Sequence, residues 1–178
     1  VFQNNLFDTP VMPGSQTTMN SNLKLYLEKE NQNLTTGVVV YENLGTRHSD
    51  RYQYTLPYYD FSKNLTSLIE DNSINGSLNF YSTGTNKLSN TNNLRTTVAN
   101  DLNYSSQRYI SKLGFENNFN LYLKNSNGIG KNDSTYTSNV QIDGMSILKI
   151  DSSFPLLKSK NTTKETLTPK ISLRINPG

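Results

Sequence analysis

The chain has 178 residues, of which 33% are hydrophobic and 17% charged, and its formal net charge is +3. An apolar content below the roughly 45–50% typical of soluble domains argues against a large buried core. The small net charge gives no electrostatic reason to expect nucleic acid as a partner. The chain has no cysteine, which excludes disulfides, iron–sulfur clusters and thiolate zinc sites built from its own residues. Low hydrophobicity is also typical of disorder, but 11 tyrosines and 7 phenylalanines, many in register, argue against a wholly disordered chain.

Residues 1–20 are predicted to be an irregular lead-in, because Pro10, Pro13 and Gly14 interrupt regular structure there. The sequence begins at Val1 without a signal peptide and stops just after a predicted strand. We therefore interpret the chain as a piece of a longer protein. Residues 21–178 are expected to hold roughly eight or nine strands.

Strands are predicted over residues 23–29, 34–42 and 51–61. A long loop follows over residues 62–75, although Leu65, Leu68 and Ile69 have helical spacing. Further strands are predicted over residues 77–83, 94–104, 109–124, 139–154 and 166–175. A polar turn is predicted over residues 86–93, and loops are predicted over residues 125–135 and 158–165.

The predicted strands share a two-residue alternation of apolar and polar side chains, as in the row Tyr52, Tyr54, Leu56 and Tyr58. Successive side chains of a strand point to opposite faces, so the sheet has one apolar and one polar face. No run approaches the ~18 apolar residues of a membrane helix. The fold class is therefore predicted to be all-β: an antiparallel up-and-down meander that is a partial, open segment of a large transmembrane β-barrel.

This fold assigns lipid to the apolar face and water to the polar face. On the last strand, Lys170, Ser172 and Arg174 are expected to point toward the lumen. The residues predicted to face lipid are Leu23, Leu25, Tyr52, Tyr54, Leu56, Leu173 and Ile175.

Residues for a reaction centre are scarce. His48 is the single histidine and lies in a polar loop beside Asp50, without the Gly-x-Ser-x-Gly turn of a hydrolase. No carboxylates have the spacing of a calcium loop, and Gly128-Ile129-Gly130-Lys131 lacks the ending of a phosphate loop. We assign no catalytic, cofactor-binding or metal-binding residues and predict that the chain is not an enzyme.

Two stretches resemble a known family. Residues 49–57 read SDRYQYTLP and continue as YYDFS, and residues 167–178 read LTPKISLRINPG shortly after FPLL at 154–157. Both are similar to the barrel domain of the lipopolysaccharide-assembly outer-membrane protein family LptD (also called OstA or Imp), in its alphaproteobacterial form. The resemblance covers roughly residues 23–178 as a middle part of that barrel, since the order of the two motifs also matches.

The resemblance implies a place in the cell outer membrane and a role in Gram-negative envelope biogenesis. Members of the family translocate lipopolysaccharide into the outer leaflet of the outer membrane. The implied partners are lipopolysaccharide, an LptE-type plug lipoprotein, the periplasmic Lpt bridge and outer-membrane lipid, and no nucleic acid. Lys170 and Arg174 are candidate lumen contacts for the phosphates or acidic sugars of lipopolysaccharide, although ordinary solvation of the lumen explains both residues as well.

The alternative is a secreted β-rich binding module, such as an adhesin or a phage fibre-like domain. Such a module hides its apolar residues in one core and uses short strands of about 5–6 residues. The length of the strands predicted here favours the barrel.

Overall fold

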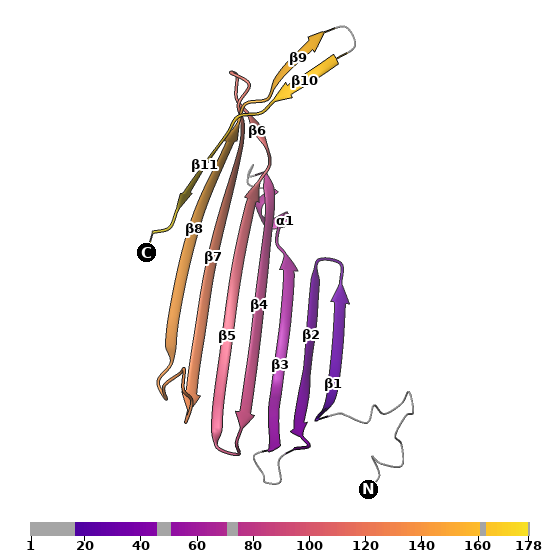
Figure 1. Cartoon of the computed structure of the whole chain (residues 1–178), viewed down its shortest axis with the longest axis vertical. Helices are drawn as coiled ribbons and strands as arrows, with labels where there is room; N and C mark the ends of the chain where they lie inside the picture. Colours follow the sequence, from indigo (N-terminus) through magenta and orange to yellow (C-terminus); the bar gives the residue numbers. More distant parts are fainter. Residues whose placement is uncertain (1–16, 46–50, 71–74, 161–162, 178) are drawn as a thin grey trace.

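The structure is a computed structural model that describes residues 17–45, 51–70, 75–160 and 163–177. Its regular structure is almost entirely β (Figure 1). The main sheet contains β1 (Thr18–Lys29), β2 (Gln32–Asn43), β3 (Tyr52–Asn64), β4 (Gly76–Ser89), β5 (Asn93–Ser106), β6 (Tyr109–Ile110), β7 (Glu116–Lys131), β8 (Gln141–Ser153) and β11 (Lys170–Ile175). A separate hairpin consists of β9 (Leu156–Lys160) and β10 (Thr163–Leu167), and α1 (Ser67–Glu70) is one short helix.

The strands of the main sheet are neighbours in chain order, β1-β2-β3-β4-β5-β7-β8-β11, with β6 paired to β7. Every pairing is antiparallel, so each strand returns beside its predecessor. The edge strands β1 and β11 do not pair with each other, and the sheet is not closed. The predicted open antiparallel meander is confirmed.

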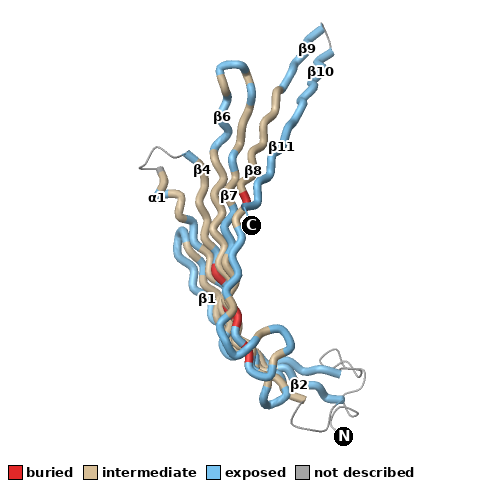
Figure 2. Tube along the Cα trace, turned by 90° about the vertical axis from the view of Figure 1, so that its left-hand side faces the viewer, coloured by how far each residue is buried: buried red, intermediate tan, exposed pale blue. Residues whose placement is uncertain are grey.

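The sheet forms a single bent layer, which Figure 2 shows from the side. Among the described residues, Ile147 is the only buried hydrophobic side chain, and none is fully buried. Leu23 of the edge strand β1 is 73% exposed. The sheet therefore has no apolar core of its own, as the low hydrophobic content predicts.

A β-bulge interrupts β3. Leu56 and Pro57 together lie opposite the single residue Asn86 of β4 and the single residue Val38 of β2. An extra residue reverses the alternation beyond it, and a bulge is also a position at which a strand accepts proline. As a result Tyr59, and not Tyr58, continues the face of Tyr52 and Tyr54, which corrects the predicted row.

Two strands extend into predicted loops. β7 continues through residues 125–131, where a loop was expected because of the asparagines and glycines. β5 pairs with this segment over its whole length, from Asn125 opposite Asn100 to Lys131 opposite Leu94. β4 likewise reaches Ser89 and β5 begins at Asn93, so the polar turn predicted over residues 86–93 is present but shorter than expected.

Near the C-terminus, the described residues of the predicted loop 158–165 lie in strands: residues 158–160 in β9 and residues 163–165 in β10. The strands predicted over 109–124 and 166–175 are each broken, the first by a turn after β6 and the second at Pro169. The loop predicted over 62–75 contains the end of β3 and the short helix α1. β1 begins at Thr18, within the predicted lead-in of residues 1–20, whose first sixteen residues lie outside the described part.

Candidate functional site: the two faces of the sheet

Followed from strand to strand through the register, the apolar parities of the strands lie on one face of the sheet, here called the apolar face. It carries the predicted residues Leu23, Leu25, Tyr52, Tyr54, Leu173 and Ile175, with Leu56 at the bulge. Lys170, Ser172 and Arg174 alternate with Ile171 and Leu173 and lie on the opposite, polar face.

Most of the large apolar residues of this face form an oblique band, while others, including Leu88, Leu94, Val98, Ile129 and Ile142, lie on the same face outside it. Leu27, the upper limit of the band in β1, lies in a row of paired residues that runs through Phe61 and Asn125 to Gly144 of β8. In β8 the upper limit of the band is Ile150, which pairs with Phe119 and lies six residues beyond Gly144. The members of the apolar band are Leu23, Leu25, Leu27, Leu34, Val38, Val40, Tyr54, Phe61, Leu78, Phe80, Leu102, Tyr104, Phe119, Leu121, Leu123, Leu148, Ile150, Ile171, Leu173 and Ile175.

The slope of the band follows from strand geometry. Six residues correspond to roughly 20 Å along a strand, and the distance from β1 to β8 across the sheet is roughly 29 Å. The band therefore rises at roughly 35° to the perpendicular of the strands. A closed barrel tilts its strands by about 35–45° from its axis, so an apolar belt around such a barrel crosses the strands at the same slope.

A row of hydrogen-bonded polar side chains, here called the polar ladder, lies on the same face beside the band. The Ser82 hydroxyl donates to Asn100 Oδ1 at 2.8 Å and therefore accepts from the Tyr59 hydroxyl at 3.1 Å. Asn100 Nδ2 donates to Asn125 Oδ1 at 3.3 Å, and the amides of Asn125 and Asn127 bond to each other. The ladder crosses β3, β4, β5 and β7, so these polar groups are satisfied within the sheet.

The ladder depends on a glycine. A side chain at Gly84 would collide with the ring of Tyr59, which lies over this position. The close approach of ring and backbone brings the Tyr59 hydroxyl to Ser82, which is only 8% exposed. Gly84 is therefore a packing requirement of the ladder.

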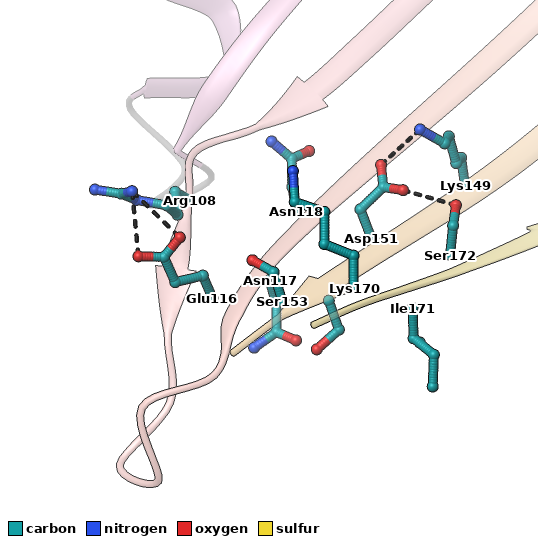
Figure 3. Close-up of a pocket in the computed structure, with 11 residues that line it drawn as sticks. Arg108, Glu116, Asn117, Asn118, Lys149, Asp151, Ser153, Lys170, Ile171 and Ser172 are labelled. Carbon is teal, nitrogen blue, oxygen red and sulfur yellow. Dashed lines mark hydrogen bonds and ion pairs between the residues drawn. The ribbon is translucent and has the colours of Figure 1, made fainter. Parts of the chain in front are cut away.

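The polar face carries a groove of about 520 Å³ between the ends of β7, β8 and β11 (Figure 3). Asp151 accepts from Lys149 at 2.8 Å and from the Ser172 hydroxyl at 2.7 Å. Arg108 forms an ion pair with Glu116 at 3.3 Å on the other side of the groove. Each of these ion pairs is exposed to solvent, so each contributes little to stability and leaves its hydrogen-bonding groups accessible to a solute.

The two predicted contact residues differ in their surroundings. Lys170 lines the groove, and no ion pair with it occurs among the described residues. Arg174 does not line the groove but lies opposite Lys149 in the register. Lys149 and Asp151 were not selected from the sequence. Both alternate with apolar residues along β8, and the pairing of β8 with β11 places them on the same face as Lys170 and Arg174.

At the far end of the polar face, the segment after β7 folds back onto the sheet. Arg95 Nε donates to Asp133 Oδ2 at 2.7 Å and its Nη2 to Oδ1 at 3.1 Å. Asp133 Oδ1 also accepts from the backbone amides of Thr135 and Tyr136 at 2.8 and 3.0 Å. These bonds to the charged form, that of Arg95 first, lower the pKa of Asp133 to about 2. The ring of Tyr136 lies over Gly128, where a side chain would collide with it.

No group of three or more metal-ligating side chains occurs among the described residues. His48 lies outside those residues. The helical part of the described chain offers no segment long and apolar enough to cross a membrane.

No protein-family model matches the chain, and no curated protein matches it. The features of the chain that bear on its function are the apolar band, the polar face and the sequence motifs.

Proposed function

We propose that the chain forms one wall of a β-barrel in the outer membrane that assembles and translocates lipopolysaccharide into the outer leaflet. In this role it is a conduit and not an enzyme. Its partners are lipopolysaccharide, an LptE-type plug lipoprotein, the periplasmic Lpt bridge and the surrounding lipid.

The slope of the apolar band is the observation that carries the membrane part of this proposal. A soluble module has no reason to arrange its apolar residues at the tilt angle of a barrel. Seven strands of 12 to 16 residues also exceed the 9–11 residues needed to cross a bilayer at that tilt. A soluble sandwich would need a second layer over the apolar face, and the described residues contain none.

The polar face supports the nature of the cargo. Lipopolysaccharide carries hydroxyl-rich sugars and phosphates, which need hydrogen-bonding groups and cations along their path. The groove beside Lys170 offers the ammonium groups of Lys149 and Lys170 and the guanidinium of Arg108, together with serine and asparagine side chains. Both ion pairs in the groove are exposed, so a phosphate can compete for their cations.

The substrate itself is inferred from the two resembling segments. Tyr54-Thr55-Leu56-Pro57 spans the β3 bulge, and Leu167-Thr168-Pro169-Lys170 spans the break between β10 and β11. Both motifs thus occur where regular strand geometry is interrupted. Such interruptions are the positions at which a strand accepts a proline, and each motif contains one.

Depletion of the protein from its host tests the proposal. We expect lipopolysaccharide to accumulate in the inner membrane or periplasm and to disappear from the surface, as measured by labelling of intact cells. Unchanged surface lipopolysaccharide together with a loss of attachment to a host or surface would favour the secreted binding module instead.

Photo-crosslinking in living cells tests the groove separately. A crosslinker at Lys170 or Arg174 is expected to capture lipopolysaccharide. The matched control is a crosslinker at Leu121 on the apolar face, which is expected to capture acyl chains of bulk lipid. Equal capture of lipopolysaccharide by crosslinkers on the two faces would refute the assignment of the cargo to the polar face.

A further inference from the structure

Two hairpins project from the same end of the sheet (Figures 1 and 2). One is the β9–β10 hairpin, and the other is the turn between β6 and β7, which contains Leu113 and Phe115. The proposed transport function uses neither hairpin, although both expose large apolar side chains. Leu113 is 78% exposed, and Leu157 and Leu167 are 67% and 65% exposed.

The β9–β10 hairpin changes in character along its length. At its base Leu156 pairs with Leu167, and Leu157 follows opposite Thr166. Further out, the pairs are Lys158 with Glu165, Ser159 with Lys164, and Lys160 with Thr163. The base is therefore aliphatic and the outer part basic, with three lysines against one glutamate. The ion pair between Lys158 and Glu165, at 3.9 Å and largely exposed, neutralises little of this charge.

The two hairpins meet at their bases. The rings of Phe115 and Phe154 lie 4.8 Å apart between centroids, and Phe154 is the residue that follows β8. The Phe154 amide donates to the Pro169 carbonyl at 3.0 Å, which fixes the β9–β10 hairpin to the end of the sheet. A small apolar groove of about 170 Å³ between Phe115, Phe154, Pro169 and Ile171 lies at this junction.

The junction directly continues the apolar band. The band reaches its highest point at Ile171 of β11, two residues beyond Pro169 and four beyond Leu167. Going outward from β11, the apolar band is thus followed by the leucine pair and then by the lysines of the hairpin. A membrane surface presents the same order from inside outward: acyl chains, the boundary region, and the layer of phosphate groups.

We propose that the exposed leucines Leu156, Leu157 and Leu167 and the lysines Lys158, Lys160 and Lys164 form a surface anchor for an anionic membrane. The leucines enter the boundary of the acyl chains, while the lysine stems lie along them and extend their ammonium groups to lipid phosphates. The anchor rests on the proposed insertion of the band in a bilayer, but its failure can be told apart from a failure of that insertion.

The sequence favours a clean test because the whole chain contains no tryptophan. Leu157→Trp creates a single fluorophore in the anchor, and Leu121→Trp creates one in the apolar band. Each variant of the full chain is folded into phosphatidylcholine vesicles with or without phosphatidylglycerol, and emission wavelength, acrylamide quenching and quenching by brominated acyl chains are recorded.

For Leu157→Trp we expect blue-shifted emission and protection from acrylamide that are stronger in the anionic vesicles. Adding Lys158→Gln, Lys160→Gln and Lys164→Gln should remove the preference, with an effect on the docking equilibrium of about fivefold per lysine. The control carries the same charge change at Lys24, Lys87 and Lys124 on the polar face and should keep the preference.

The combined outcomes separate the two proposals. If the tryptophan at 121 is quenched by brominated lipid while that at 157 stays in water in both vesicles, the anchor is wrong and the hairpin is left for a protein partner. If neither tryptophan meets lipid, membrane insertion fails and the anchor with it. If only the tryptophan at 157 meets lipid, the hairpin binds a membrane surface on its own, and both the spanning wall and the dependence of the anchor on that wall are refuted. An equal blue shift in neutral and anionic vesicles overturns the role of the lysines.

Discussion

Arg95 and Asp133 are 38 residues apart in sequence, yet they form a two-pronged ion pair at 2.7 and 3.1 Å. The pair fixes the segment after β7 to the polar face of β5, and the Gly130 amide donates to the Thr137 carbonyl at 2.8 Å beneath it. The position of this segment on the polar face therefore depends on the carboxylate of Asp133.

The pKa of Asp133 predicts how this contact depends on pH. The folded value of about 2 lies below the roughly 3.9 of an unfolded chain. A lowered pKa stabilises the fold above the unfolded value, and this stabilisation is lost as the pH falls from about 4 through 2. The protection factor of the Gly130 amide, measured by hydrogen exchange, should fall over this range. In Asp133→Asn, which keeps an oxygen for the backbone amides, protection should be low at every pH. A wild-type protection factor that is flat from pH 5 to about 2 would contradict the role of Asp133.

The two faces predict opposite responses to arginine. Leu173→Arg adds a charge to the apolar band, which is the proposed lipid face, and an arginine at mid-bilayer costs about 2–4 kcal/mol. Ser172→Arg adds the same charge to the neighbouring polar position. We expect Leu173→Arg to impair assembly, measured as the heat-modifiable folded form in detergent or lipid, and Ser172→Arg to leave it intact. Equal losses in the two variants would refute the face assignment.

Gly84 and Gly144 predict a contrast between two identical substitutions. In Gly84→Ala the new methyl group collides with the Tyr59 ring, and overpacking of this kind costs about 1–3 kcal/mol. In Gly144→Ala the methyl group would meet only the Lys124 carbonyl oxygen, at 4.0 Å. Denaturant unfolding should therefore show a lower free energy of unfolding for Gly84→Ala and no loss for Gly144→Ala. A similar effect at both sites would mean that Tyr59 moves aside freely.

The polar ladder should be sensitive to its central member. Asn100→Ala removes the acceptor of the Ser82 hydroxyl, and leaving a buried hydroxyl unsatisfied costs about 1–3 kcal/mol. Asn103→Ala, on the polar face of the same strand, is the matched control. We expect the free energy of unfolding to fall only in Asn100→Ala, and an equal decrease in the control would leave the ladder without a stabilising role.

The alternation of apolar residues was enough to predict the class of fold and its open meander, because period-two patterning depends only on local strand geometry. The extension of β7 through Asn125 and Gly130 was not predictable in the same way. Asparagine and glycine favour turns locally, but here Asn125 bonds within the ladder and Gly128 makes room for Tyr136. The extension of β7 is therefore determined by contacts with its neighbours and not by its own amino-acid composition.

Which side chains meet on the polar face was also not predictable from the sequence. Lys170 could be selected as a candidate because its strand alternates clearly, whereas its neighbours in the groove come from β7, β8 and the residues before β6. Which of them meet depends on the register of three strands. The bulge at Leu56 and Pro57 is a similar case, since one extra residue exchanges the faces of Tyr58 and Tyr59 without any change in composition.

The nearest-neighbour order of the strands has a consequence for how such a wall can change during evolution. Because each strand along this order pairs with the strand that precedes it and the strand that follows it in the main sheet, removing or duplicating one hairpin leaves all other pairings and both faces as they were. Adding a single strand would instead reverse the direction of every later strand and move each later turn to the opposite end of the sheet. The number of strands in such a wall is therefore expected to vary between descendants in steps of two.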